Sequence, residues 1–283
     1  MIDLHVHSTE SDGTNTPQEL VSLAKEAGLT AFALTDHDTI SGIPKARAAA
    51  EKIQMELVPG IELSTDYEGT EVHMLGYYID ETNPEFLTRL QAFIDSRDNR
   101  NEKMALLLQK EGFDITLDNL YREYPDSVIT RAHFARYLVE HGMVKDRETV
   151  FSKYLGNDCR CYVPREKIDP FEAIRLIQMG GGVSFFAHPI LCHMNFDRLK
   201  RFISDLKDAG LTGIEAIYSA NSPGDTRNLK KIAEDSHLLI SGGSDYHGAN
   251  KPYLRLGVGR GSLYVPDEVL ISIKQAVANK SGV

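Results

Sequence analysis

The sequence is poor in cysteine and lacks long apolar runs. Among its 283 residues only Cys159, Cys161 and Cys192 are cysteines. Three cysteines are too few, and odd in number, for a disulfide framework, which favours a reducing cytosol. Cys159 and Cys161 form a C-x-C pair, which alone is weak evidence for zinc. No apolar run is long enough to span a bilayer, and no basic segment followed by an apolar stretch opens the chain. We therefore expect a cytoplasmic protein with no membrane role.

Positive charge is also scarce. The chain has 31 Lys and Arg against 41 Asp and Glu, which gives a net charge of −10. Affinity for the nucleic-acid backbone comes from clustered Lys and Arg, and no basic–aromatic stripe is evident in the sequence. We therefore expect no duplex nucleic acid and no obligate protein partner. A small phosphorylated ligand is still compatible where bound cations offset the acidic charge.

Short β-type runs alternate with amphipathic helical patterns along most of the chain. The runs predicted as strands cover residues 2–7, 30–38, 55–64, 70–79, 182–189, 213–219 and 238–247. The third and fourth are expected to pair as a hairpin around Tyr67–Gly69. Repeated strand–helix units predict an α/β fold with a parallel sheet, closed or nearly closed into a barrel. In such barrels, chemistry collects at the carboxyl ends of the strands.

One stretch breaks this alternation. A long helical pattern covers about Pro84 to Lys110, and helical pieces without a convincing strand continue to about Pro164. The pattern predicts a helical insertion between barrel units. We accordingly expect a first part of the barrel over residues 1–100, a helical cap over 101–168 and a second part of the barrel over 169–283.

Histidines and carboxylates recur at or just beyond the ends of the predicted strands. They are His5, His7, Asp12, His37, Glu62, His73, His188, Asp245 and His247. A single such residue is more often a packed or surface side chain, or a turn former in the case of Asp12. Because strand residues two apart point the same way, His5 and His7 share a side. The recurrence at one topological position favours metal ligation by the whole set.

The types of ligand atom in this set narrow the choice of metal ion. Imidazole and carboxylate without thiolate suit Zn, Mn or Fe(II), and Mg is less natural. Nine ligands are too many for one ion, so two or three ions are expected, with Glu62 and an Asp as bridges. Divalent cations lower the pKa of a bound water and stabilise the oxygens of a phosphoester.

Together these segments resemble the PHP (polymerase and histidinol phosphatase) family. The motifs that carry the resemblance are "DLHVHSTESDGT", "ALTDHDT", "PGIELST", "EVHMLGY", "FFAHP" and "SGGSDYHG". The resemblance implies a distorted (β/α)7 TIM-like barrel with a trinuclear metal site. It assigns His5, His7, Glu62 and Asp245 to one ion, Glu62, His73 and His188 to a second, and Asp12, His37 and His247 to a third.

Residues 129–142, "ITRAHFARYLVEHG", resemble the standalone phosphoesterases of the RNase AM and nucleoside 3',5'-bisphosphate phosphatase type. In that subgroup the insertion caps the site, which directs Arg131 and His133 at substrate phosphate. The alternative is that both lie on the polar face of a helix.

The function implied is hydrolysis of nucleotide phosphate esters by a metal-bound hydroxide. The expected substrates are 3',5'-bisphosphonucleosides, 5'-mononucleotides or short oligoribonucleotides. His188, Asp245 and His247 are the expected catalytic residues, and the sequence does not choose the proton donor to the leaving group.

Three alternatives stay open. One is a histidinol-phosphate-type phosphatase. The second is an amidohydrolase-type C–N hydrolase, although such enzymes usually need a lysine at a strand end and none is evident. The third is a PHP module without catalytic activity, which the complete set of ligand residues disfavours.

Overall fold

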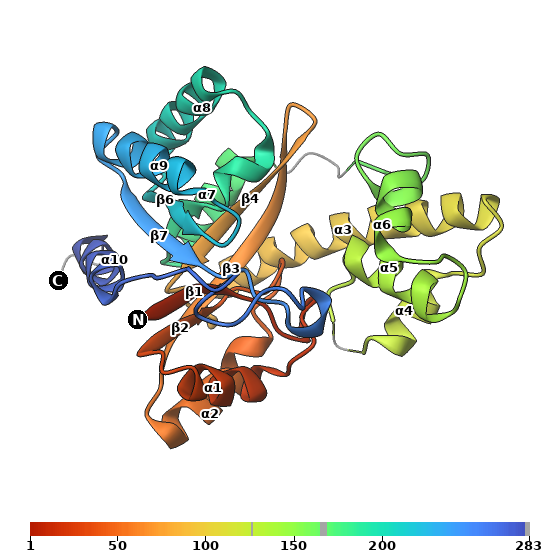
Figure 1. The fold of residues 1–283 in the computed structure, drawn as a ribbon, viewed down its shortest axis with the longest axis horizontal. Helices are drawn as coiled ribbons and strands as arrows, with labels where there is room; N and C mark the ends of the chain where they lie inside the picture. Colours follow the sequence, from red (N-terminus) through yellow and green to blue (C-terminus); the bar gives the residue numbers. More distant parts are fainter. Residues whose placement is uncertain (126, 165–168, 281–283) are drawn as a thin grey trace.

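The computed structural model describes residues 1–125, 127–164 and 169–280. Its strands form one seven-stranded sheet in chain order (Figure 1). The strands are β1 (Ile2–Val6), β2 (Ala31–Leu34), β3 (Glu56–Tyr67), β4 (Thr70–Tyr77), β5 (Val183–Phe186), β6 (Gly213–Tyr218) and β7 (Leu239–Gly243). The first and last strands lie next to one another at their carboxyl ends. There the amide of Asp245, which follows β7, donates to the carbonyl of His5 in β1 at 2.9 Å. The sheet is therefore nearly closed, and the predicted barrel is confirmed.

The prediction of a parallel sheet is wrong at β4. This strand is antiparallel to both β3 and β5, whereas the remaining neighbours are parallel. Glu68 and Gly69 join β3 to β4 with positive φ angles of 52° and 78°. A two-residue connection of this kind forms a tight hairpin, and a hairpin can only be antiparallel. The hairpin expected around Tyr67–Gly69 is thus present, and it reverses the direction of β4.

Amphipathic helices surround the sheet. They are α1 (Pro17–Glu26), α2 (Gly42–Ile53), α7 (Pro170–Met179), α8 (Phe196–Asp208), α9 (Pro223–Asp235) and α10 (Asp267–Lys280). In α1 the side chains of Thr16 and Glu19 form a capping box and Pro17 occupies the first turn, which fixes where the helix begins. Its buried residues Leu20 and Ala24 join a core cluster with Phe32 of β2. The packing of the apolar faces of these helices against the sheet holds the ends of the strands in place.

Between β4 and β5 the chain forms helices with a hydrophobic core of their own. These are α3 (Pro84–Lys110), α4 (Leu117–Glu123), α5 (Arg131–Glu140), α6 (Arg147–Val150) and the π-helical turn η1 (Phe151–Leu155). Buried Leu108, Phe134 and Leu138 belong to their core cluster. Figure 1 shows α3 running from the barrel to α4, α5 and α6, which stand to one side.

The predicted division of the chain into three parts stays a prediction. Helix α3 passes through residues 100 and 101 without interruption, so the first proposed boundary falls inside one helix. The second, at residue 168, lies outside the described residues.

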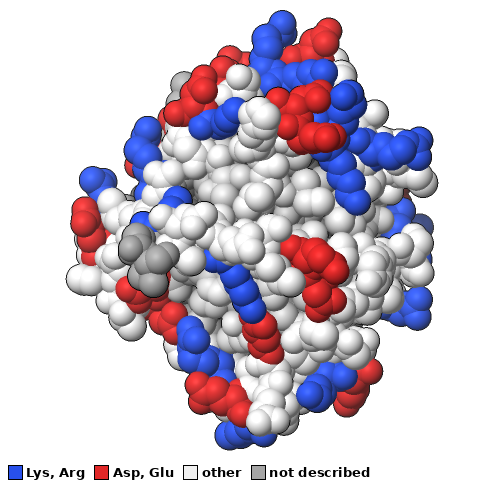
Figure 2. All heavy atoms as spheres, turned by 90° about the vertical axis from the view of Figure 1, so that its left-hand side faces the viewer, with Lys and Arg blue, Asp and Glu red and all other residues white. Residues whose placement is uncertain are grey.

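Surface charge is mixed on the face that Figure 2 shows. Lys and Arg side chains alternate with Asp and Glu around its margin, a largely uncharged area lies above the centre, and charged side chains of both signs lie at and below the centre. Within the described ranges, no helix is both long and apolar enough to cross a membrane.

Candidate metal centre

The nine predicted ligand residues come together at one end of the barrel. His5 lies in β1 and His7 directly follows it, while His37, His188 and the pair Asp245 and His247 follow β2, β5 and β7. Glu62 and His73 differ from the prediction, because they lie inside β3 and β4 rather than at strand ends. Both strands continue past the parallel part of the sheet as the hairpin, which places mid-strand residues at the level of the other ligands.

The loop after β1 is held by Asp36, so that Asp12 turns toward the imidazoles. The amide of Ser8 donates to Asp36 Oδ1 at 2.7 Å, and the Ser11 hydroxyl donates to the same oxygen at 2.6 Å. Asp12 Oδ1 then lies 3.2 Å from His247 Nε2. The polar residues after the two histidines therefore fold the loop as well as supplying a ligand.

Donor atoms gather in four overlapping groups, within each of which the atoms lie within 4.8 Å of one another. The groups are His7, Asp12, His37 and His247; His5, His7 and Asp245; His5, Glu62 and His188; and His37, Glu62 and His73. Several residues occur in two groups. This overlap is the arrangement that neighbouring cations with shared ligands require.

Glu62 lies at the middle of the centre and is 1% exposed. Its Oε1 is 2.9 Å from a ring nitrogen of His73 and 2.9 Å from one of His188. Its Oε2 is 3.1 Å from His5 and His7 and 3.3 Å from His37. One carboxylate thus faces five imidazoles, which is the geometry of a bridging ligand.

The donor set fits divalent cations. The buried atoms His5 Nε2, both ring nitrogens of His7, His37 Nδ1, His188 Nδ1 and Asp12 Oδ1 have no hydrogen-bond partner among the described residues. An unpaired buried polar atom costs about 1–3 kcal/mol. Cations that coordinate these atoms would remove that penalty.

The carboxylates and imidazoles shift one another's pKa. Burial disfavours the charged form of His7, but the nearby carboxylates of Asp245 and Glu62 stabilise that form, outweigh the effect of burial and raise its pKa to about 9. The same balance with Glu62 raises the pKa of His73 to about 10. Burial dominates at His37 and lowers its pKa to about 3. Without cations the centre therefore holds protons in their place.

Glu215, in β6, is a functional candidate that the sequence did not reveal. It is fully buried, and its Oε1 lies 3.0 Å from His5 Nδ1 while its Oε2 accepts the amide of His188 at 2.7 Å. A carboxylate on the far nitrogen fixes the tautomer of His5 and leaves Nε2 facing the centre. The one available signal was a single acidic residue in a strand predicted to be buried.

Lys251 and Tyr218 were also missed. Lys251 Nζ is 2.6 Å from Asp245 Oδ2, and the Tyr218 hydroxyl donates to the same oxygen at 2.8 Å. The other oxygen, Oδ1, faces His5 and His7 at 3.7 and 3.5 Å. Both side chains therefore orient Asp245 with one oxygen toward the centre.

A pocket of about 180 Å³ adjoins the centre. Its lining includes Asp12, His37 and His73 of the centre and three arginines, Arg97, Arg100 and Arg131. Arg97 is ion-paired with buried Asp38, so it connects α3 to the barrel. The pocket thus combines the imidazole centre with guanidinium groups, which are suited to anionic ligands.

Arg131 and His133 lie near this centre, at the start of α5. Arg131 is ion-paired with Glu71 and donates to Asn157 Oδ1 at 3.1 Å. His133 Nδ1 accepts the amide of Thr130 at 3.0 Å, and burial lowers its pKa to about 4. His133 is therefore neutral at neutral pH, and any contact with phosphate would be a hydrogen bond rather than an ion pair.

Comparison with known proteins agrees with this geometry. The PHP domain family matches residues 3–155. A 5'-3' exoribonuclease of Haemophilus influenzae is 37% identical over 245 residues, covering 87% of this chain and 89% of that protein. A 3',5'-nucleoside bisphosphate phosphatase of Chromobacterium violaceum is 35% identical over 248 residues, covering 87% of each.

A solved structure of a metal-dependent phosphoesterase from Bifidobacterium adolescentis superposes with a TM-score of 0.85 at 30% identity. The match covers 96% of this chain and 94% of that one. The family match spans more than half of the sequence, and the relatives align over nearly all of it. The chain therefore belongs to the PHP domain family.

Proposed function

We propose that this chain is a metal-dependent phosphoesterase that hydrolyses phosphate esters of nucleotides. The observation that carries the proposal is Glu62, a buried carboxylate that faces five imidazoles within 3.3 Å. The named relatives are hydrolytic enzymes of the same reaction class. The nine gathered residues are the proposed ligands, for two or three ions of Mn, Zn or Fe.

Cations bound there would lower the pKa of water and offset the charge of a phosphate group. The chain's own residues hold the centre in shape. Glu215 orients His5, while Lys251 and Tyr218 orient Asp245. His188, Asp245 and His247 are the proposed catalytic residues, because they lie at the centre and would hold the cations that act on the phosphate.

The pocket beside the centre supports a nucleotide as substrate. Arg97, Arg100 and Arg131 line it together with two of the imidazoles. A phosphate ester at the centre would thus place the rest of the molecule beside guanidinium groups, which pair with a second phosphate. The proposed substrates are 3',5'-bisphosphonucleosides, 5'-mononucleotides and short oligoribonucleotides, handled in the cytoplasm.

The first test is loss of hydrolysis. Asp245→Asn and His188→Ala should each abolish release of phosphate from an aryl phosphate in Mn(II), with the circular dichroism spectrum unchanged. Asp205→Asn, on the exposed side of α8, is the matched control and should retain full activity. Full activity in metal-loaded Asp245→Asn protein would refute the assignment.

The second test ranks substrates. Turnover in Mn(II) is compared for 3',5'-bisphosphonucleosides, 5'-mononucleotides, short RNAs and histidinol phosphate. We expect a nucleotide substrate to be preferred. Preference for histidinol phosphate would overturn the substrate class while leaving the reaction class standing.

A C–N hydrolase is the competing reaction class. A lysine does lie at the centre, but Lys251 comes from the loop after β7 and pairs with the oxygen of Asp245 that faces away from His5 and His7. Glu62 occupies the bridging position instead. Hydrolysis of cyclic amides without hydrolysis of phosphomonoesters would favour the competing class.

A further inference from the structure

One segment of this acidic chain is basic and carries no acidic residue. From Gly248 to Pro266 it contains Lys251, Arg255 and Arg260, with no Asp or Glu, although the net charge of the chain is −10. The cations are spread over many positions, so they form no evident stripe in the sequence. Whether these cations form a binding surface depends on the course that the segment takes across the barrel.

This basic segment begins at the metal centre and leads away from it. Its first residue follows His247, and the side chain of Asn250 donates to the carbonyl of Asp12 at 2.7 Å. The segment ends beside the first residue of β1, where the amide of Ile2 donates to the carbonyl of Val265 at 3.1 Å. It therefore runs along the barrel wall from the carboxyl end of β1 to its amino end.

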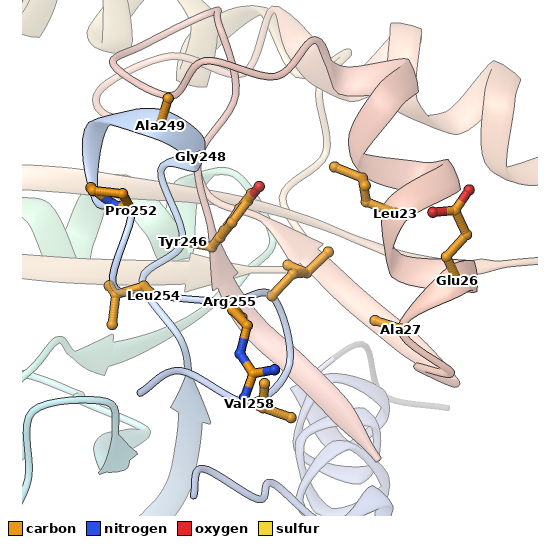
Figure 3. Close-up of a pocket in the computed structure, with 11 residues that line it drawn as sticks. Leu23, Glu26, Ala27, Tyr246, Gly248, Ala249, Pro252, Leu254, Arg255 and Val258 are labelled. Atoms are coloured by element: carbon orange, nitrogen blue, oxygen red, sulfur yellow. The ribbon is translucent and has the colours of Figure 1, made fainter. Parts of the chain in front are cut away.

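A groove follows the segment. It measures about 650 Å³ and lies between the segment and the carboxyl half of α1. Figure 3 shows Tyr246, Leu254 and Arg255 along one side, and Leu23 and Glu26 of α1, with Ala27 directly after it, across from them. Pockets of about 300–1,000 Å³ hold drug-sized ligands, so there is room for one or two nucleotides.

The side chains along the segment have the chemistry of a single-strand binding surface. Tyr253 and Tyr264 are 60% and 63% exposed. They and Arg260 lie outside the lining of the groove, and Tyr253 stands in the chain between Pro252 and Leu254, which line it. The guanidinium of Arg260 lies over the Tyr253 ring, 5.3 Å from its centroid. The exposed guanidinium of Arg255 has no ion pair or hydrogen bond with any described residue. Exposed aromatic rings stack bases, and cations follow the backbone phosphates.

One feature of the groove opposes an anionic ligand. Glu26 is the acidic residue among those lining it. It lies across the groove from Arg255 in Figure 3 and forms no ion pair with it in the described structure. A phosphate would pass on the Arg255 side, while Leu23 and Ala27 offer apolar contact for a base.

We propose that the groove and the exposed side chains of the basic segment beside it together bind the uncleaved part of a single-stranded oligoribonucleotide whose end occupies the metal centre. The proposal rests on the proposed function, because it needs hydrolysis at the centre. It adds, for the oligoribonucleotides among the proposed substrates, a second contact surface beyond the pocket of Arg97, Arg100 and Arg131. A mononucleotide would not reach the groove.

The test compares two substrates on the same variants. We expect Tyr253→Ala and the double variant Arg255→Ala/Arg260→Ala to lower kcat/KM for a five-nucleotide RNA roughly five- to tenfold or more, since each lost base stack or phosphate contact weakens binding. The same variants should leave kcat/KM for a 3',5'-bisphosphonucleoside unchanged. Arg89→Ala, on the exposed side of α3, is the control and should affect neither substrate.

Salt supplies a second readout. For the parent protein, kcat/KM for the RNA should fall more steeply with salt concentration than kcat/KM for the bisphosphonucleoside. The double variant should lose that difference. Equal effects of the variants on both substrates, or none on either, would overturn the groove proposal. Absence of turnover on every nucleotide substrate by the parent protein would instead count against the proposed function, and RNA binding by electrophoretic shift would then test the groove alone.

Discussion

At the scale of single residues, the centre is an unusual concentration of buried titratable groups. Glu62 and Asp245 have pKa values held well below the usual range; burial alone would raise them, but the histidines, and at Asp245 also Lys251, outweigh it. His7 and His73 have pKa values raised to about 9 and about 10. Protons and cations thus compete for the same nitrogen atoms.

This competition predicts that cation binding releases protons. At pH 7.5 the metal-free protein holds protons on His7 and His73, because their pKa values of about 9 and about 10 lie above that pH. Mn(II) binding should release about two protons from this pair, and its apparent affinity should rise with pH until both have titrated. Calorimetry in buffers of different ionisation enthalpy measures the number released, and heats independent of the buffer would contradict the prediction.

Glu215 gives a second prediction at this scale. Glu215→Gln keeps the size of the side chain but removes the charge beside His5 Nδ1, which lowers the basicity of the ligand. Loss of such a partner typically weakens metal affinity about 10- to 100-fold. Competition with a chelator should show that loss, and Glu234→Gln, on exposed α9, should show none. Unchanged affinity would mean that Glu215 serves folding alone.

The residue types explain which parts of the centre could be predicted. Histidines such as His188 and His247 were found because several of them recur at predicted strand ends. Glu215 and Lys251 were not, since one acidic residue in a strand and one lysine in a loop have no periodic partner. Glu215 reaches His5 only because the nearly closed barrel brings the side chains of β6 and β1 together, and Lys251 reaches Asp245 only through the course of the loop after β7.

At the scale of elements, the approach of β7 to β1 sets the shape of the centre. A Cβ on Gly243 would lie 2.4 Å from the Cβ of His5 and 2.5 Å from its backbone nitrogen. No real side chain tolerates such distances, so the strands meet this closely only because residue 243 is glycine. Closure of the barrel and placement of His5 depend on the same position.

Gly243→Ala should therefore both destabilise the protein and weaken cation binding. Overpacking of this kind costs about 1–3 kcal/mol, which urea unfolding of the metal-free protein measures. At Gly224 an added Cβ would have its nearest neighbour at 3.5 Å, so Gly224→Ala should change stability by less than about 0.5 kcal/mol. Equal stability of the two variants would argue against tight closure.

The elements themselves were largely predictable, because their start and stop signals are local. Helix α3 begins at Pro84 and ends at Lys110, as its pattern predicts. The direction of β4 was not predictable from strand–helix alternation, since it depends on the two-residue turn at Glu68 and Gly69. That same turn carries β3 beyond Glu62, which explains why this ligand lies inside a strand.

At the scale of the whole molecule, the ligands come from distant parts of the chain, between His5 and His247. Cations that hold them together bind the folded chain in preference to the unfolded one. Metal at about 100 times its dissociation constant should add about 2.7 kcal/mol per site to the free energy of unfolding. The midpoint temperature of thermal unfolding should therefore rise when Mn(II) is added and fall back when a chelator removes it. A midpoint that responds to neither would contradict cation binding at the centre.

The most direct test of the metal centre is anomalous diffraction from crystals of the protein grown with Mn(II). If the nine side chains are ligands, two or three anomalous peaks lie around Glu62, each in contact with several of them. Peaks confined to other surfaces, or density showing Glu62 bonded only to protonated imidazoles at saturating Mn(II), would contradict that role.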